Sequence, residues 1–451
     1  MSRSPFPVRG VIEGFYGLFY THPERLSLLD FMGRHGYNLY IYGPKNDRQH
    51  RNRWREPYPA RLLEQFGEAV GLSREMGIDF CYALSPGIDI CYSSEEEFEH
   101  VSGKFLQFYK LGVRDFSLLL DDIRRTFPNQ RDADSYSSFA QAQADLCNRV
   151  YAWLQKLDPK CRLSMCPTDY HGAPPFSPAL HELGSALHPH IDVFYTGTQV
   201  CSAAVDRAEV EVFAATLKRR PILWDNYPVN DLAMDGELHI GPVRGRAEDL
   251  AEAMRGAIVN PMNQAEASKI VLATYADYLE DPGSYSPETS WEPALSEVAG
   301  EHRKELRMVA ENSLHCCLGT PEAKRLGELS DAAIAAMEAE VTDDPAIDEL
   351  VSYLEELDEA CYALRYRMEN LELRNELAPW LEQLERWTWL GRWSVETLRA
   401  QRSTERVDTR LLRRIEEYVD LVARHPKRMG GTHLLPLATL ALERCRQQEA
   451  A

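Results

Sequence analysis

The feature that most constrains the fold is a repeated alternation of short apolar runs and longer amphipathic segments over residues 1–300. Short runs rich in β-branched and aromatic residues are typical of buried strands, and apolar residues spaced by three and four are typical of helices. The strand-like runs lie at residues 8–13, 38–42, 78–84, 116–120, 162–166, 191–195, 221–224 and 257–259. Eight strands alternating with helices predict a (β/α)8 TIM barrel, which is an α/β fold.

The ends of these runs share a second feature. Each run stops in polar, Gly or aromatic residues, and helical segments follow, most clearly over residues 59–76 and 134–157. Barrel enzymes carry their active sites at the carboxyl ends of the strands. The pattern therefore predicts that the chemistry is concentrated on one rim of the barrel.

Residues 301–451 have a different pattern, in which strand-like runs give way to segments rich in Glu, Arg and Leu. Apolar residues recur there at alternating steps of three and four, the heptad pattern by which one helix packs along another. This seam comprises Ile347, Leu350, Leu354, Leu357, Cys361, Leu364, Met368 and Leu371. We therefore predict two domains, a catalytic barrel over residues 1–300 and an all-α helical bundle over residues 301–451.

Prolines and N-cap residues give the expected helix limits in the second domain. Asp344 followed by Pro345 predicts a helix start, and Thr320 followed by Pro321 predicts an earlier one. Pro379 is expected to end a helix before a segment rich in Trp, and residues 410–424 are expected to form a further helix. The seam leaves two alternatives open: it joins two protomers in a homodimer through the helical domain, or it closes a bundle within one chain.

Charge and cysteine content narrow the class of protein. The formal net charge of −20 opposes binding to phosphate backbones, so we expect no nucleic-acid partner. No apolar run approaches the length of about 18 residues that a membrane span requires. The 10 Cys residues form no CxxC pair, which favours free thiols in a reducing compartment. With an N-terminus that lacks an apolar signal segment, we expect a cytoplasmic protein without a membrane partner.

The run at residues 116–120 ends in two carboxylates, Asp121 and Asp122. Carboxylates at the end of a buried strand are costly to desolvate, so a function is expected of them. Because side chains alternate along a strand, the two can face one ligand only if the chain turns here. Two adjacent carboxylates cannot both ionise freely, which suits a general acid near neutral pH. The alternative is that both merely cap the following helix.

The sequence motifs for a metal site, a nucleophilic serine or a nucleotide site are incomplete or absent. A metal site would need more ligands, and the HExxH-like string that begins at His181 has Ser185 in place of the second His. The ALSPG string around Ser85 departs from a nucleophile elbow at its first position. No GxGxxG or Walker-type loop is present, so we expect no metal and no cofactor.

Aromatic and amide residues at the strand ends indicate the kind of ligand. Sugar rings have apolar faces that stack on aromatic rings, and their hydroxyls bond to amides, carboxylates and ammonium groups. The residues of these types at strand ends are Phe15, Tyr16, Tyr170, Trp224, Lys45, Asn226, Asp231 and Asn260. Together they predict a carbohydrate pocket.

Eight segments in this order are similar to those of the β-N-acetylglucosaminidases that include the O-GlcNAcases. They are GVIEGFYG, YIYGPKND, WREPYP, LLLDDI, CPTDY, FYTGT, LWDNYPVND and VNPMNQAEASKI, and they cover roughly residues 7–280. The resemblance implies a retaining hydrolase in which the acetamido oxygen of the substrate is the nucleophile and an oxazoline forms, a recognised exception to the commoner double displacement.

The resemblance also implies a role for each site residue. Asp121 would polarise the acetamido group, and Asp122 would act as general acid and then as general base. Tyr170 would bond to the acetamido group, while Thr196 and Trp224 would wall the acetyl pocket. The sugar and its hydroxyls would be bound by Gly14, Lys45, Asn226, Asp231 and Asn260. Cys166 either lines this pocket, as Phe15 and Tyr16 would, or is an ordinary core cysteine of the barrel.

The expected function is therefore that of an exo-acting glycoside hydrolase that removes O-linked β-N-acetylglucosamine from Ser or Thr of modified proteins. Two alternatives stay open. One is a hexosaminidase acting on free β-GlcNAc glycans, hyaluronan or peptidoglycan fragments. The other is an inactive glycan-binding scaffold, against which the intact pair of aspartates argues.

Overall fold

The computed structural model describes residues 4–339, 344–402 and 408–450. The chain divides into two compact units, here named the barrel unit and the helical unit. The barrel unit comprises Met1–Leu232 and Pro242–Ser290, and the helical unit comprises Ala233–Gly241 and Trp291–Ala451. The short segment 233–241 thus belongs to the helical unit although it lies within the barrel part of the sequence.

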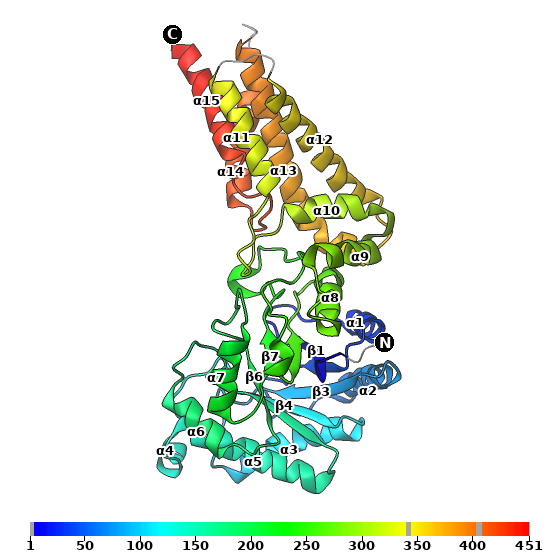
Figure 1. Cartoon of the computed structure of the whole chain (residues 1–451), viewed down its shortest axis with the longest axis vertical. Helices are drawn as coiled ribbons and strands as arrows, with labels where there is room; N and C mark the ends of the chain where they lie inside the picture. Colours follow the sequence, from blue (N-terminus) through cyan, green and yellow to red (C-terminus); the bar gives the residue numbers. More distant parts are fainter. Residues whose placement is uncertain (1–3, 340–343, 403–407, 451) are drawn as a thin grey trace. The chain divides into compact units, whose positions relative to one another are not determined.

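Eight parallel strands close the barrel unit in chain order, and β1 pairs with β8 (Figure 1). Every predicted strand is present, with limits that differ from the prediction by at most one residue. The strands are β1 (Val8–Glu13), β2 (Leu39–Tyr42), β3 (Asp79–Leu84), β4 (Asp115–Leu119), β5 (Arg162–Cys166), β6 (Asp192–Tyr195), β7 (Ile222–Asp225) and β8 (Gly256–Val259). The prediction of a TIM barrel is confirmed.

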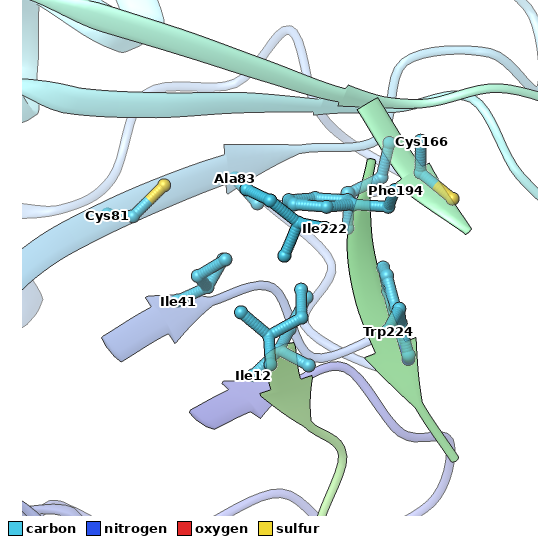
Figure 2. Close-up of a cluster of buried hydrophobic side chains, with 10 residues drawn as sticks. Ile12, Ile41, Cys81, Ala83, Cys166, Phe194, Ile222 and Trp224 are labelled. Carbon is cyan, nitrogen blue, oxygen red and sulfur yellow. The ribbon is translucent and has the colours of Figure 1, made fainter. Parts of the chain in front are cut away.

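Side chains from all around the barrel fill its interior (Figure 2). Ile12, Ile41, Phe194, Ile222 and Trp224 lie in one cluster of buried residues, each with less than 5% of its surface exposed. Successive side chains of a strand point to opposite faces. In a barrel one face points into the interior, and the other face points toward the helices. The filled interior fixes the strand ends, and with them the side chains that follow each strand.

Each strand of the barrel unit is followed in sequence by a helix or a short 3-10 turn. The helices are α1 (His22–Arg34), α2 (Ala60–Glu75), α3 (Glu95–Lys110), α4 (Gln130–Ser135), α5 (Phe139–Leu157), α6 (Pro178–Ala186), α7 (Arg207–Leu217) and α8 (Ala265–Glu280), with short 3-10 turns at Leu232–Met234 and Leu250–Glu252. The single helix predicted over residues 134–157 is wrong. Tyr136 is extended, and the Ser138 hydroxyl accepts from the Gln141 N–H, so Ser138 caps a new helix.

The helical unit consists of helices that pack on one another, as predicted for the C-terminal region. They are α9 (Pro287–Ala299), which begins in the barrel unit, the 3-10 turn Gly300–His302, α10 (Arg303–Glu311), α11 (Lys324–Glu338), α12 (Pro345–Tyr366), α13 (Leu371–Arg402), α14 (Thr409–Arg424) and α15 (Leu435–Ala450). Asp344 caps α12 by accepting from the Ala346 N–H, as expected. The start predicted at Thr320 is wrong, because α11 begins only after Ala323, whose left-handed φ of 48° does not continue a helix.

The predicted helix break at Pro379 is also wrong, because α13 continues through this residue. Interior proline costs about 3 kcal/mol through a lost hydrogen bond and a steric clash. The neighbouring Leu377, Trp380 and Leu381 are fully or almost fully buried. Burial of each such side chain contributes roughly 1.5–3 kcal/mol, so three of them outweigh the proline.

The heptad seam lies mostly on α12 and is used within the chain. From Ile347 to Met368 its members are at most 1% exposed, whereas Leu371 is half exposed at the start of α13. The seam therefore closes an intramolecular bundle, which was one of the two alternatives. In the part of the chain that the structure describes, no helix combines the length and the apolar character needed to cross a bilayer.

Candidate active site

The two aspartates follow β4, and the chain turns between them. Asp121 is 4% exposed, whereas Asp122 is exposed and has a left-handed φ of 53°. Such a φ is uncommon outside Gly, although Asp tolerates it better than most residues. The following helix α4 is capped by Asn129 and not by either aspartate, so the cap-only alternative is wrong. The two adjacent carboxylates lie in different environments.

Asp121 forms a buried ion pair with Lys45, which follows β2. Lys45 Nζ lies 2.5 Å from Asp121 Oδ2, and the two side chains are 2% and 6% exposed. The same ammonium lies 5.7 Å from the centre of the Trp224 ring. Asp121 Oδ1 is buried and has no hydrogen-bond partner among the described residues. One carboxylate oxygen is thus held by a cation, and the other is free to accept from a ligand.

Asp122 is held by two tyrosines from other strand ends. Tyr16 Oη donates to Asp122 Oδ2 and Tyr170 Oη donates to Asp122 Oδ1, each at 2.9 Å. Burial raises the pKa of both tyrosines, and the negative charge of Asp122 raises the pKa of each further. Both phenols therefore stay protonated near neutral pH and can donate to the Asp122 carboxyl group.

A chain of hydrogen bonds connects β1, β7 and β8 at the same rim. The Gly14 N–H donates to Asn260 Oδ1 at 3.2 Å, and Asn260 Nδ2 donates to Asn226 Oδ1 at 2.9 Å. Trp224 Nε1 donates to the same Asn226 oxygen at 2.8 Å. A Cβ at residue 14 would lie 2.7 Å from Trp224 Cζ2, so only glycine allows the indole to approach this closely.

Two further predicted residues join this network through the backbone. Asp231 Oδ2 accepts from the Tyr16 N–H at 2.7 Å, and burial followed by the charge of Asp122 raises the pKa of Asp231. The Thr196 N–H donates to the Tyr170 carbonyl at 3.0 Å, while its hydroxyl donates to the Gln199 carbonyl. These bonds fix the loops that carry Tyr16 and Tyr170, the two partners of Asp122.

Two of the proposed lining residues are core residues in the structure. The Phe15 ring is fully buried and packs edge-on against Tyr20, with ring centres 5.1 Å apart. Cys166 is 1% exposed and belongs to the barrel cluster that contains Trp224. Burial raises the pKa of the Cys166 thiol, and the charge of Asp121 raises it further. A thiol in this position is a small apolar neighbour of the site.

Comparison with known proteins identifies the family. A family model described as beta-N-acetylglucosaminidase matches residues 9–311, which is more than half of the chain. The chain belongs to the β-N-acetylglucosaminidase family. The resemblance seen in the sequence motifs is thereby confirmed, and the dyad lies within the matched residues.

Individual β-N-acetylglucosaminidase relatives extend this result. The protein O-GlcNAcases of Rattus norvegicus and Mus musculus are each 35% identical over 274 residues, which is 60% of this chain. That match covers only 29% of each relative, so the chain spans much less than the length of these proteins. A solved variant of the Thermobaculum terrenum O-GlcNAc hydrolase is similar over 99% of this chain and 97% of its own, with 31% identity and a TM-score of 0.89.

Arg51 is a residue of this β-N-acetylglucosaminidase site that the sequence did not indicate. It is 7% exposed, and its guanidinium donates to Tyr16 Oη at 3.0 Å and to the Asp122 carbonyl at 3.2 Å. It also lies 5.5 Å from the centre of the Tyr16 ring. Arg51 belongs to the charged string RQHRNR, which resembles an ordinary polar loop, and no spacing distinguishes this arginine from its neighbours.

Asn263 was missed although it lies within a recognised motif. Its Nδ2 donates to the carbonyls of Tyr16 and Leu18, at 2.9 and 2.7 Å. This amide therefore holds the loop after β1 against the loop after β8. The motif VNPMN could have indicated this residue, because it contains Asn263 as well as the predicted Asn260.

Among residues 4–339, 344–402 and 408–450, no three His, Cys, Asp or Glu side chains are arranged to hold a metal ion. Lys45 and Arg51 bring positive charge into contact with the dyad. The site therefore offers a buried acceptor at Asp121 and an exposed carboxyl group at Asp122. This pair of environments can assign separate roles to two neighbouring acids.

Proposed function

We propose that this chain is a retaining exo-β-N-acetylglucosaminidase that removes O-linked β-N-acetylglucosamine from Ser or Thr residues of modified proteins. The observation that carries the proposal is the different environment of the two aspartates. Asp121 is buried, paired with Lys45, and keeps one free acceptor oxygen. Asp122 is exposed and held by two phenols. Rat and mouse relatives named protein O-GlcNAcase support this choice of substrate.

In the first step, Asp121 Oδ1 accepts from the acetamido N–H of the substrate. The acetamido oxygen then attacks the anomeric carbon, and the bond from that carbon to the leaving oxygen breaks. Asp122 gives its proton to the leaving oxygen and Asp121 takes the acetamido N–H proton, so a neutral oxazoline remains and the Ser or Thr hydroxyl departs. The ion pair with Lys45 holds the Asp121 carboxyl group in place, and the buried setting strengthens its bond to the substrate.

In the second step, Asp122 removes a proton from water, which attacks the anomeric carbon and opens the oxazoline. Asp121 returns its proton to the nitrogen, so the acetamido group is restored. The exposure of Asp122 supports this role, because both a leaving hydroxyl and a water must reach it. Tyr16 and Tyr170 hold the carboxyl group in place for both steps. The product is β-configured, as a retaining mechanism requires.

The remaining site residues are proposed to bind the sugar. Trp224, Thr196 and Tyr170 form the acetyl pocket, with Cys166 and Phe15 as buried support behind it. The hydroxyls are bound by Gly14, Lys45, Asn226, Asp231 and Asn260. The bonds among Trp224, Asn226 and Asn260 support this assignment, since they fix the amides before a ligand binds.

A chromogenic assay tests the proposal. Wild-type protein should release nitrophenol from nitrophenyl β-N-acetylglucosaminide and not from the matching β-glucoside, which lacks the acetamido group. Added chelator should leave the rate unchanged. Absence of turnover would contradict the enzyme and support the binding scaffold. Faster hydrolysis of chitobiose than of an O-GlcNAc-modified protein would support the free-glycan hexosaminidase.

Assembly and location are separate proposals. We propose a cytoplasmic protein, and buried thiols that form no disulfide, such as Cys81, Cys147 and Cys361, support this location. A homodimer through the helical unit would need surfaces other than the α12 seam, because that seam is buried within the chain. Light scattering of the purified chain decides this point, and a monomer mass would exclude the dimer.

A further inference from the structure

Arg51 is a buried cation whose hydrogen bonds to the residues that the structure describes go to neutral oxygens and not to a carboxylate. It is 7% exposed, and its guanidinium donates to the Tyr16 hydroxyl at 3.0 Å and to the Asp122 carbonyl at 3.2 Å. The buried cations Arg25 and Lys45, in contrast, each contact a carboxylate directly. A buried charge is costly to desolvate unless its surroundings compensate it. A function is therefore expected of Arg51, and both of its partners lie at the dyad.

The Tyr16 hydroxyl connects this cation to the Asp122 carboxyl group. Its oxygen accepts from Arg51, and its proton is donated to Asp122 Oδ2 at 2.9 Å. Burial and the charge of Asp122 raise the pKa of Tyr16, and the charge of Arg51 only partly opposes them, so the phenol stays protonated. A hydroxyl that accepts from a cation is polarised and becomes a stronger donor. Arg51 thereby strengthens the bond between Tyr16 and the carboxyl group.

The backbone of Tyr16 has supports other than Arg51. Its N–H donates to Asp231 Oδ2 at 2.7 Å, and its carbonyl accepts from Asn263 Nδ2 at 2.9 Å. The loop that carries the phenol is therefore held from both sides. We expect loss of the Arg51 guanidinium to change the bonds of the hydroxyl and not the position of this loop.

The second bond of Arg51 acts on the backbone of Asp122. This residue has a left-handed φ of 53°. Residues other than glycine keep such a conformation only where the surrounding structure imposes it. Because the guanidinium donates to the Asp122 carbonyl, one side chain contacts the strained backbone and, through Tyr16, the carboxyl group of the same aspartate.

We propose that Arg51 is a positioning residue for Asp122, which it holds through the backbone carbonyl and through the Tyr16 hydroxyl. The inference rests on the proposed function, in which Asp122 is the general acid and base. Arg51 contacts no reacting atom in this account, since it acts only through its two partners. Other titratable groups also act on Asp122 and are common to all the variants compared below: Asp121, Cys166, Tyr170 and Asp231.

The pH profile of kcat/KM on a serine-linked β-N-acetylglucosaminide tests the inference. Its alkaline limb reports loss of the proton from the general acid. Arg51→Met removes the charge and both bonds, so the carboxyl group keeps its proton more easily. The limb should move to higher pH by roughly half to one unit, and kcat/KM at the optimum should fall about tenfold. Arg51→Lys keeps the charge and should move the limb less than half as far.

Tyr16→Phe decides whether Arg51 acts through the phenol. This variant lacks the connecting hydroxyl, so it should also move the limb to higher pH. In the Tyr16→Phe background, Arg51→Met should move the limb less than it does in wild type, because the two residues act on Asp122 as a unit. Arg51→Gln replaces Arg51→Met in both comparisons if the latter does not fold.

Arg55→Met is the matched control. Arg55 lies in the same segment after β2, but it pairs with Asp89 and Glu97 at 2.9 and 2.6 Å. This variant should keep the wild-type limb. The inference alone is overturned if Arg51→Met keeps the wild-type limb, as a purely structural role predicts, or if its shift is equally large in the Tyr16→Phe background. An alkaline limb that persists in Asp122→Asn contradicts the proposed function, and the inference with it.

Discussion

The barrel unit and the helical unit differ in where their ion pairs lie. The barrel unit buries complete ion pairs: Arg25 with Glu13, Arg246 with Asp225, and Lys45 with Asp121, with every one of these side chains less than 10% exposed. The helical unit buries an apolar seam and has pairs such as Arg399 with Asp348 on its surface. Buried pairs gain little net stability, because desolvation offsets their attraction. Their place at the strand ends indicates that the barrel unit uses them to position a site.

The contacts of these buried pairs support that interpretation. Glu13 accepts from the Tyr20 N–H as well as from Arg25, and Tyr20 packs on Phe15. Asp225 accepts from the Tyr227 N–H and from Tyr275 Oη in addition to Arg246. Each carboxylate therefore holds the loop after its own strand. Those loops carry Tyr16 and Asn226, which belong to the candidate site.

The largest effect that is common to all substrates should come from the buried pair at the site. Asp121→Asn removes the charge that we propose polarises the acetamido group, and it leaves the Lys45 ammonium unpaired. Loss of one electrostatic stabiliser typically costs about 10²–10³-fold in kcat, and we expect a loss near the upper end. The reduction should be similar for substrates with good and poor leaving groups, since Asp121 acts on the nucleophile. Steady-state kinetics on two aryl β-N-acetylglucosaminides measures it.

A pair of leucine variants tests whether both units contribute to stability and only the barrel unit contributes to activity. Leu119 in the barrel cluster and Leu357 in the α12 seam are both 0% exposed. Truncation of either to Ala should lower the free energy of unfolding by about 2–5 kcal/mol. Only Leu119→Ala should also lower kcat/KM, because Leu119 precedes the dyad and belongs to the cluster that contains Trp224.

Denaturant titration and kinetics of the two leucine variants, made at a temperature where both stay folded, check this prediction. The comparison fails if Leu357→Ala loses as much kcat/KM as Leu119→Ala. In that case the helical unit would contribute directly to the reaction.

A smaller effect should appear in the response to acid. Burial, followed by the charge of Lys45, lowers the pKa of His50 to about 3, and His50 Nδ1 bonds to the Ala83 carbonyl. Between about pH 6.5 and 3 the unfolded chain holds a proton that the folded chain does not, so stability rises with pH there. The stability is fully present above pH 6.5 and is lost toward pH 3, with a slope of at most about 1.4 kcal/mol per pH unit.

His50→Gln should reduce this slope, because Gln does not titrate. Urea titrations of both proteins between pH 7 and 5 measure the difference, provided that the variant folds. Equal slopes would show that His50 does not contribute to the acid response, and that other groups of the barrel unit cause it.

The fold could be predicted largely because its signal is local. Apolar runs gave every strand to within one residue, and the step of three and four gave the buried seam from Ile347 to Met368. The errors arose where tertiary burial or a capping hydroxyl outweighed a local rule. Pro379 lies inside a helix because its neighbours are buried, and Ser138 divides a segment that has one continuous pattern.

The site could be predicted only in part, because position along a strand does not give side-chain partners. The sequence indicated Asp121 and Asp122 by their place after an apolar run. It could not give the turn at Asp122 or the role of Arg51, which depend on loops meeting from β1, β2 and β4. The sequence also could not distinguish the adjacent aromatic residues Phe15 and Tyr16. In the structure the Phe15 ring is buried, whereas Tyr16 is only partly buried.

The most direct test of the central claim is the effect of the leaving group on Asp122→Asn. A dinitrophenyl β-N-acetylglucosaminide needs little protonation of its leaving oxygen, whereas a serine-linked substrate needs much. We predict that the variant loses about 10²–10⁴-fold in kcat/KM on the serine-linked substrate and far less on the dinitrophenyl substrate. Equal losses on the two substrates would contradict the assignment of Asp122 as the general acid, and with it the division of roles between the two aspartates.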